Sequence, residues 1–171
     1  MSVTNRAVLA TLFLVAFATA SFSSASSLDT AKFIGKWQFN KEQSTDLSPW
    51  SRSDLEIAQA GDQLTISRTL RGGRRTHVDV IPLDVNKEVN VVPQGWWIDN
   101  RHIGAYSPHN ATKIVRAKTI DDGKLLRLET DLVLETQQGP RDVNIISQYQ
   151  ISPDGDTLIV TDVHVFTRIT E

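Results

Sequence analysis

Residues 124–136 read Lys-Leu-Leu-Arg-Leu-Glu-Thr-Asp-Leu-Val-Leu-Glu-Thr, and this stretch decides the fold. One alternate set of positions is apolar apart from a threonine: Leu126, Leu128, Thr130, Leu132 and Leu134. The other set is charged except for one valine: Arg127, Glu129, Asp131, Val133 and Glu135. A period of two is typical of a β-strand with one packed face and one solvated face. Residues 141–152 repeat the alternation, so we expect an antiparallel pair of strands.

Working outward, short β-branched runs are divided by turn signals rich in Gly, Asn, Asp and Pro. Apart from a helical turn near residues 29–33, no segment after residue 28 shows a sustained helical period. The pattern predicts strands near residues 35–40, 53–60, 63–71, 74–82, 86–92, 96–106, 112–120, 124–136, 141–152 and 156–169.

The fold class that follows is all-β, an antiparallel up-and-down meander of about ten strands. Closure into a barrel would remove the exposed sheet edges, so we expect a closed barrel. A flat β-sandwich is the alternative architecture.

The first residues have the three-part layout of a secretory signal peptide. Arg6 gives a positive charge, residues 7–17 form an uncharged apolar run, and small residues follow. Eleven apolar residues are too few to span a bilayer as a helix. We expect a signal peptide helix over residues 1–25, cleaved after Ala20 or Ala25, and one domain over residues 26–171. The mature protein is expected to be periplasmic or extracellular, with no membrane span.

Composition argues against several kinds of function. The formal net charge is −2, whereas nucleic-acid binders usually show a basic excess, so we expect no nucleic-acid partner. The absence of cysteine excludes disulfides, thiolate metal sites and a cysteine nucleophile. The four histidines show no metal-ligand spacing, and no catalytic or phosphate-binding motif is present. We therefore expect no metal, no cofactor and no catalytic residue.

A Gly-x-Trp motif, Gly35-Lys36-Trp37, opens the first predicted strand. It resembles the signature of the lipocalins and fatty-acid-binding proteins (calycins). The longer stretch Gly35-Lys36-Trp37-Gln38-Phe39-Asn40, with Ser44, Pro49 and the late hairpin Ser-Pro-Asp-Gly-Asp-Thr-Leu at residues 152–158, is similar to small secreted bacterial lipocalin-like domains of largely unassigned role. The resemblance implies a barrel whose closed end is plugged by Trp37. It also implies that Arg168, late in the last strand, packs across that indole, as a guanidinium can over an aromatic face.

Several side chains are candidates for binding a ligand inside the barrel. Arg68 follows Leu64 and Ile66 at a period of two, which aims it inward, where it needs an acid, a tyrosine or a ligand carboxylate as partner. Tyr149 is the second anchor candidate, and either Trp96 or Trp97 is expected to line the wall. Asp162 and His164 join this inward group if Leu158, Val160 and Phe166 face inward. They are solvated if Ile159, Thr161 and Val163 face inward instead.

These features favour a secreted or periplasmic protein that binds a small apolar or amphipathic molecule inside a β-barrel. Apolar burial would supply the affinity, and one or two polar groups would fix the orientation. One alternative is an envelope protein with a filled barrel that binds a partner through its surface. Another is an enzyme that uses an acid or a histidine at the barrel mouth.

Overall fold

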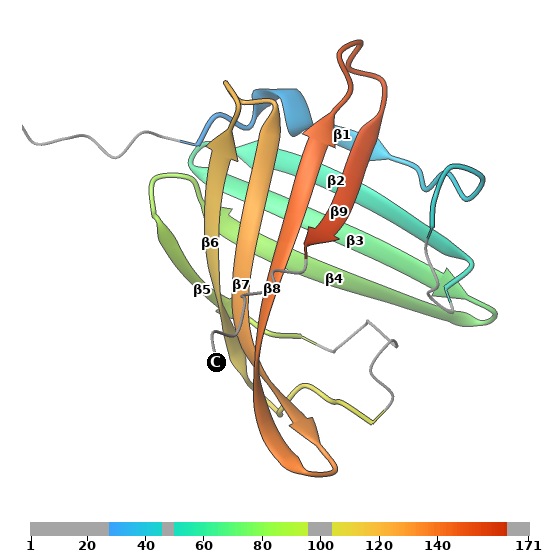
Figure 1. The fold of residues 1–171 in the computed structure, drawn as a ribbon, viewed down its shortest axis with the longest axis vertical. Helices are drawn as coiled ribbons and strands as arrows, with labels where there is room; N and C mark the ends of the chain where they lie inside the picture. The colour runs from blue at the N-terminus through green and yellow to red at the C-terminus, as the bar shows by residue number, and fades with distance from the viewer. Residues whose placement is uncertain (1–27, 46–49, 96–103, 164–171) are drawn as a thin grey trace, which may run out of the picture.

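The computed structural model describes residues 28–45, 50–95 and 104–163. This part of the chain is all-β, as the sequence predicts. A short 3₁₀ turn, η1 (Ala31–Phe33), precedes nine strands (Figure 1). Their bounds are β1 Gly35–Trp37, β2 Arg52–Ala60, β3 Gln63–Gly72, β4 Arg75–Asp84, β5 Val89–Pro93, β6 Thr112–Ile120, β7 Leu125–Thr136, β8 Gly139–Ile151 and β9 Leu158–Val163.

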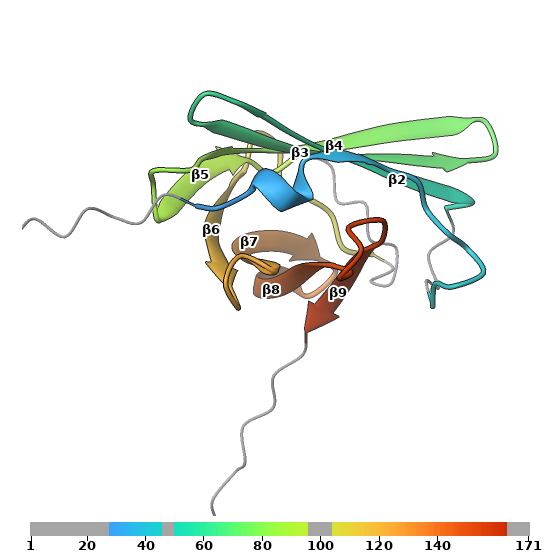
Figure 2. The same ribbon diagram turned by 90° about the horizontal axis from the view of Figure 1, so that it is seen from above.

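The strands form two antiparallel sheets in which strand order follows the chain. The N-terminal sheet has the order β1-β2-β3-β4, and the C-terminal sheet has the order β5-β6-β7-β8-β9. Figure 2 shows the two sheets as facing layers, with η1 at one end of the space between them. We call the two surfaces that face this space the inner faces.

Strand β7 shows why these residues form a sheet with one packed face. Leu126, Leu128, Thr130, Leu132 and Leu134 are all buried, and the intervening residues are more exposed. On β8, Tyr149 lies on the same inner face because it pairs with Leu126. Ile146 departs from the pattern: it is buried although it lies on the opposite face of β8.

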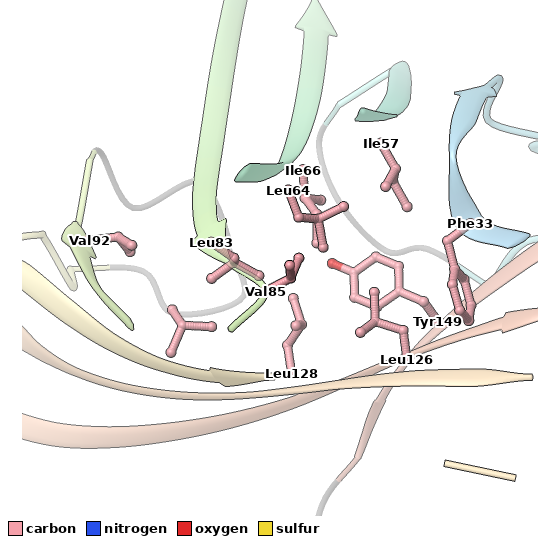
Figure 3. Close-up of a cluster of buried hydrophobic side chains, with 11 residues drawn as sticks. Phe33, Ile57, Leu64, Ile66, Leu83, Val85, Val92, Leu126, Leu128 and Tyr149 are labelled. Carbon is pink, nitrogen blue, oxygen red and sulfur yellow. The ribbon is translucent and has the colours of Figure 1, made fainter. Parts of the chain in front are cut away.

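The apolar core lies between the sheets at the end that η1 covers. Phe33 from η1 and Leu64 from β3 are fully buried, and so is Leu126 from β7. Figure 3 shows these side chains gathered with others from β2, β4, β5 and β8. Burying a side chain of this size stabilises the fold by roughly 1.5–3 kcal/mol. The core is therefore what joins the two sheets.

Within the described residues, ladder pairs join neither β4 to β5 nor β1 to β9. At the β4–β5 junction a side chain takes the place of a ladder: Asn90 Oδ1 accepts from the Asp84 amide at 2.8 Å. The Asn90 side-chain nitrogen also donates to the Lys87 carbonyl at 3.3 Å. The closed barrel therefore stays a prediction, and the described architecture is two facing sheets.

Two of the ten predicted strands lie partly outside the described residues. In the predicted 96–106 strand, residues 96–103 are not described. Of the described residues 104–106, only Tyr106 forms a β-bridge, and its partner is Glu135. The predicted 156–169 strand is described up to Val163 as β9. The expected signal peptide also lies outside the described residues, so its helix and cleavage stay predictions.

Candidate functional site

The inner face of β3 is apolar except at one position. Leu64, Ile66 and Leu70 are buried, but Arg68, which lies between Ile66 and Leu70 on that face, is exposed. Arg68 therefore shares the inward face, as predicted, while its guanidinium stays accessible to solvent. Its Nε donates to Ser53 Oγ at 2.9 Å, and its cross-strand partner on β4 is Asp79.

Tyr149 faces Arg68 from the C-terminal sheet. The ring is buried against the apolar cluster, and Figure 3 shows its hydroxyl directed into that cluster. Burial raises the pKa of Tyr149 to about 12, whereas the charge of Arg68 lowers it. The charges of Asp162 and Asp79 raise it further. The phenol is therefore neutral at physiological pH, and three charged groups influence its pKa.

The pairing of β8 with β9 places Asp162 on the same inner face. Val160 pairs with Tyr149, and Asp162 pairs with Ser147, whose hydroxyl donates to Asp162 Oδ1 at 2.9 Å. Of the two registers open from sequence, β9 adopts the one in which Leu158, Val160 and Asp162 face inward. Val160 is nevertheless 48% exposed, because β9 is an edge strand.

The neutral state of Tyr149 predicts a loss of stability at high pH. A tyrosine side chain ordinarily has a pKa of 10.0, and in the folded protein the pKa of Tyr149 is about 12. Between these values the unfolded chain ionises while the folded chain does not. The free energy of unfolding should therefore fall across this range by about 2 kcal/mol. Urea unfolding at about pH 9.5 and about pH 11.5 measures the change.

The matched variants separate Tyr149 from other groups that titrate in this range. Tyr149→Phe should be less sensitive to this pH step than the unmodified protein. Tyr106→Phe, at a tyrosine that is 64% exposed, should keep the full sensitivity. Equal sensitivity in the two variants would contradict a perturbed Tyr149.

A second polar group on the inner faces was not predicted from the sequence. Lys113 of β6 is buried, and its Nζ lies 3.7 Å from Asp79 Oδ2, so an ion pair links the two sheets. Gln94, just beyond β5, is also buried, and its Nε2 donates to the Val133 carbonyl at 2.8 Å. One signal was available: Arg116 and Lys118 mark the opposite face of β6 as solvated, which turns Lys113 inward.

The remaining predicted site residues are placed only in part. Gly35 and Trp37 lie in β1, and the Trp37 indole donates to the Phe33 carbonyl at 3.1 Å, at the end of η1. Four other predicted residues lie outside the described residues: Trp96, Trp97, His164 and Arg168. The stacking of Arg168 on Trp37 and the placement of a tryptophan in the wall therefore stay predictions.

A surface hollow of about 360 Å³ lies beside β1 and β2. Trp37 and Leu55 contribute its apolar lining, and Lys36, Arg52 and Glu56 are among its charged residues. Lys36 and Arg52 are already paired with Glu56 and Asp54, at 3.6 and 2.7 Å. The cations of the hollow are therefore already engaged by neighbouring carboxylates.

The described residues contain neither a metal-binding group nor a membrane-spanning helix. Among them, no three His, Cys, Asp or Glu side chains group so that they could hold a metal ion. None of the helical segments described is both long and apolar enough to cross a membrane. No protein-family model, curated protein or solved structure matches this chain.

Proposed function

We propose that this protein is an exported, lipocalin-like binding protein that holds a small amphipathic molecule between its sheets. One observation carries the proposal: Arg68, Tyr149 and Asp162 gather on facing inner surfaces beside an apolar core. Closure into a barrel and export by a signal peptide are parts of the same proposal, and they rest on the sequence.

The arrangement suits a ligand with an apolar body and a polar end. The apolar body would contact the buried aliphatic side chains, gaining about 25 cal/mol per Å² of apolar surface removed from water. The polar end would meet the Arg68 guanidinium, which remains exposed although it lies on an inner face. An acidic group fits best, because a guanidinium binds a carboxylate through two parallel hydrogen bonds.

Tyr149 is compatible with this assignment, because its buried ring adds apolar surface and its hydroxyl is directed into the apolar cluster. The phenol stays protonated well above physiological pH, so it does not repel an anion. Asp162 lies farther along the inner face and is engaged by Ser147. Its charge would disfavour a second anionic group, so the ligand should carry a single acid.

Native mass spectrometry of the exported protein tests the proposal. A reproducible small adduct is expected, and solvent extraction should release an amphipathic acid. Arg68→Leu should reduce the adduct at least about fivefold, because the charged contact is lost. The intact mass of the same sample also reports whether cleavage has followed Ala20 or Ala25.

The control is Arg71→Leu, an exposed arginine on the opposite face of the same strand. It should leave the adduct unchanged, and near-ultraviolet circular dichroism confirms that both variants fold. If the protein purified from several source extracts shows only the mass of the chain without an adduct, the proposal is overturned.

One observation favours the surface-binding alternative. Val91 of β5 is 66% exposed, and its cross-strand neighbour Ile114 is 37% exposed on the same outer face. Val89, two residues earlier, is 46% exposed. Solvent-exposed aliphatic groups of this kind mark interaction surfaces when they form a continuous patch. If mass spectrometry shows no adduct, the surface-binding alternative is favoured, and this outer face is the candidate interaction surface.

A further inference from the structure

The buried group formed by Lys113, Asp79 and Gln94 adjoins the Arg68 anchor and has unused hydrogen-bonding capacity. Gln94 is only 4% exposed, and its Oε1 accepts no hydrogen bond from the residues that the structure describes. A buried oxygen of this kind usually has a partner, either a protein group, a water or a ligand. Its Nε2 is already used by the Val133 carbonyl.

Lys113 lies next to Gln94 on the inner face of the C-terminal sheet. Val92 pairs with Lys113, and the backbone N–H of Gln94 donates to the Ala111 carbonyl. The side chains of Lys113 and Gln94 are therefore diagonal neighbours on one face of the sheet. The side chain of Lys113 is 8% exposed. Its 3.7 Å separation from Asp79 is longer than an N–H···O hydrogen bond, so this ion pair does not occupy an ammonium donor.

The backbone beyond Gln94 passes close to Asp79 at Gly95. A Cβ at Gly95 would lie 3.5 Å from Asp79 Oδ1. Asp79, Lys113 and Gln94 thus bring a carboxylate, an ammonium and an unsatisfied amide oxygen to one end of the intersheet space.

The chemistry of these three groups selects among possible ligand groups. A carboxylate would be repelled by Asp79 and cannot donate to Gln94 Oε1. An ammonium would be repelled by Lys113. A hydroxyl can accept from the Lys113 ammonium and donate to the Gln94 or Asp79 oxygen. We propose that Lys113, Asp79 and Gln94 form a polar subsite that recognises a hydroxyl group on the ligand.

This inference rests on the proposed function, in which Arg68 holds the acidic end of the same ligand. Arg68 and Asp79 are cross-strand partners, so the two polar subsites are adjacent. The ligand class that fits both is a hydroxylated aliphatic acid.

Isothermal titration calorimetry with decanoic acid and its 3-, 6- and 10-hydroxy derivatives tests the subsite. At least one hydroxy derivative should bind about five- to tenfold more tightly than decanoic acid. Lys113→Met should abolish this preference, so that decanoic acid and its hydroxy derivatives bind with similar affinities. Lys118→Met, at an exposed lysine on the same strand, is the control and should retain the preference.

The outcomes separate the subsite from the binding function itself. If decanoic acid binds but no hydroxy derivative binds more tightly, the subsite is wrong and the proposed function stands. The subsite is also wrong if the preference survives Lys113→Met. If none of the four acids binds, the amphipathic-acid site fails and the subsite fails with it. Should Lys113→Met not fold, Asp79→Leu combined with Lys113→Met removes both charges and takes its place.

Discussion

Replacing Lys113 by methionine is expected to lower the free energy of unfolding by about 3 kcal/mol. The substitution leaves the Asp79 carboxylate, only 18% exposed, without its partner across the two sheets. Removing one member of a buried ion pair costs more than the pair contributes, because the remaining charge stays poorly solvated. Urea unfolding followed by tryptophan fluorescence measures the effect.

The double variant Asp79→Leu with Lys113→Met shows whether the cost comes from the orphaned charge. It should be within about 1 kcal/mol of the unmodified protein, since apolar replacements of similar volume often match a buried ion pair. The exposed control Lys118→Met should change stability by less than about 0.5 kcal/mol. Equal destabilisation in the single and double variants would mean that lost packing, and not charge, is responsible.

Leu126→Ala is expected to lower the free energy of unfolding by about 3 kcal/mol as well, for a different reason. Leu126 is fully buried beside Tyr149, so truncation removes apolar contacts and leaves a cavity between the sheets. Val133→Ala is the matched control, because Val133 is 37% exposed on the opposite face of the same strand. It should cost less than about 1 kcal/mol.

Equal losses in these two variants would contradict the assignment of faces on β7. A loss below about 1 kcal/mol for Leu126→Ala would mean that the core closes around the missing methyl groups. Chemical unfolding under the conditions used for Lys113→Met allows a direct comparison.

The strands were the most predictable part of this molecule, because alternation and turn residues act locally. On β7, four leucines on one face and charged residues on the other allow only one orientation. The final strand could not be oriented in this way, since both of its faces carry aliphatic residues. Its pairing with β8, which aligns Val160 with Tyr149, decides the orientation.

The polar group at Asp79 could not be predicted from β4 alone. Val78 and Val80 are the apolar alternates next to Asp79, yet they are 51% and 43% exposed. The register is fixed farther along the strand, where Leu83 pairs with Leu64 in the apolar core. The core at one end of the strand therefore turns a charged residue inward at the other.

Whether the two sheets close into a barrel could not be predicted from local sequence patterns either. Hairpin turns within a sheet and the junction between two sheets have the same composition in the sequence. Among the described residues no ladder joins β4 to β5, and the Asn90 side chain accepts from the Asp84 backbone amide there. Nothing in the residue type distinguishes this asparagine from one at a hairpin tip.

The order of strands also has a consequence for biosynthesis. Because each sheet is built from consecutive strands, β1–β4 can complete their mutual pairing once Asp84 has emerged from the ribosome. The apolar side chains of Leu64 and Leu83 then have no cover until Leu126 and Tyr149 follow. A partly synthesised chain thus exposes a hydrophobic surface, and such intermediates are prone to aggregate. The yield of this protein should depend on how fast its second half emerges and on chaperones that shield the first.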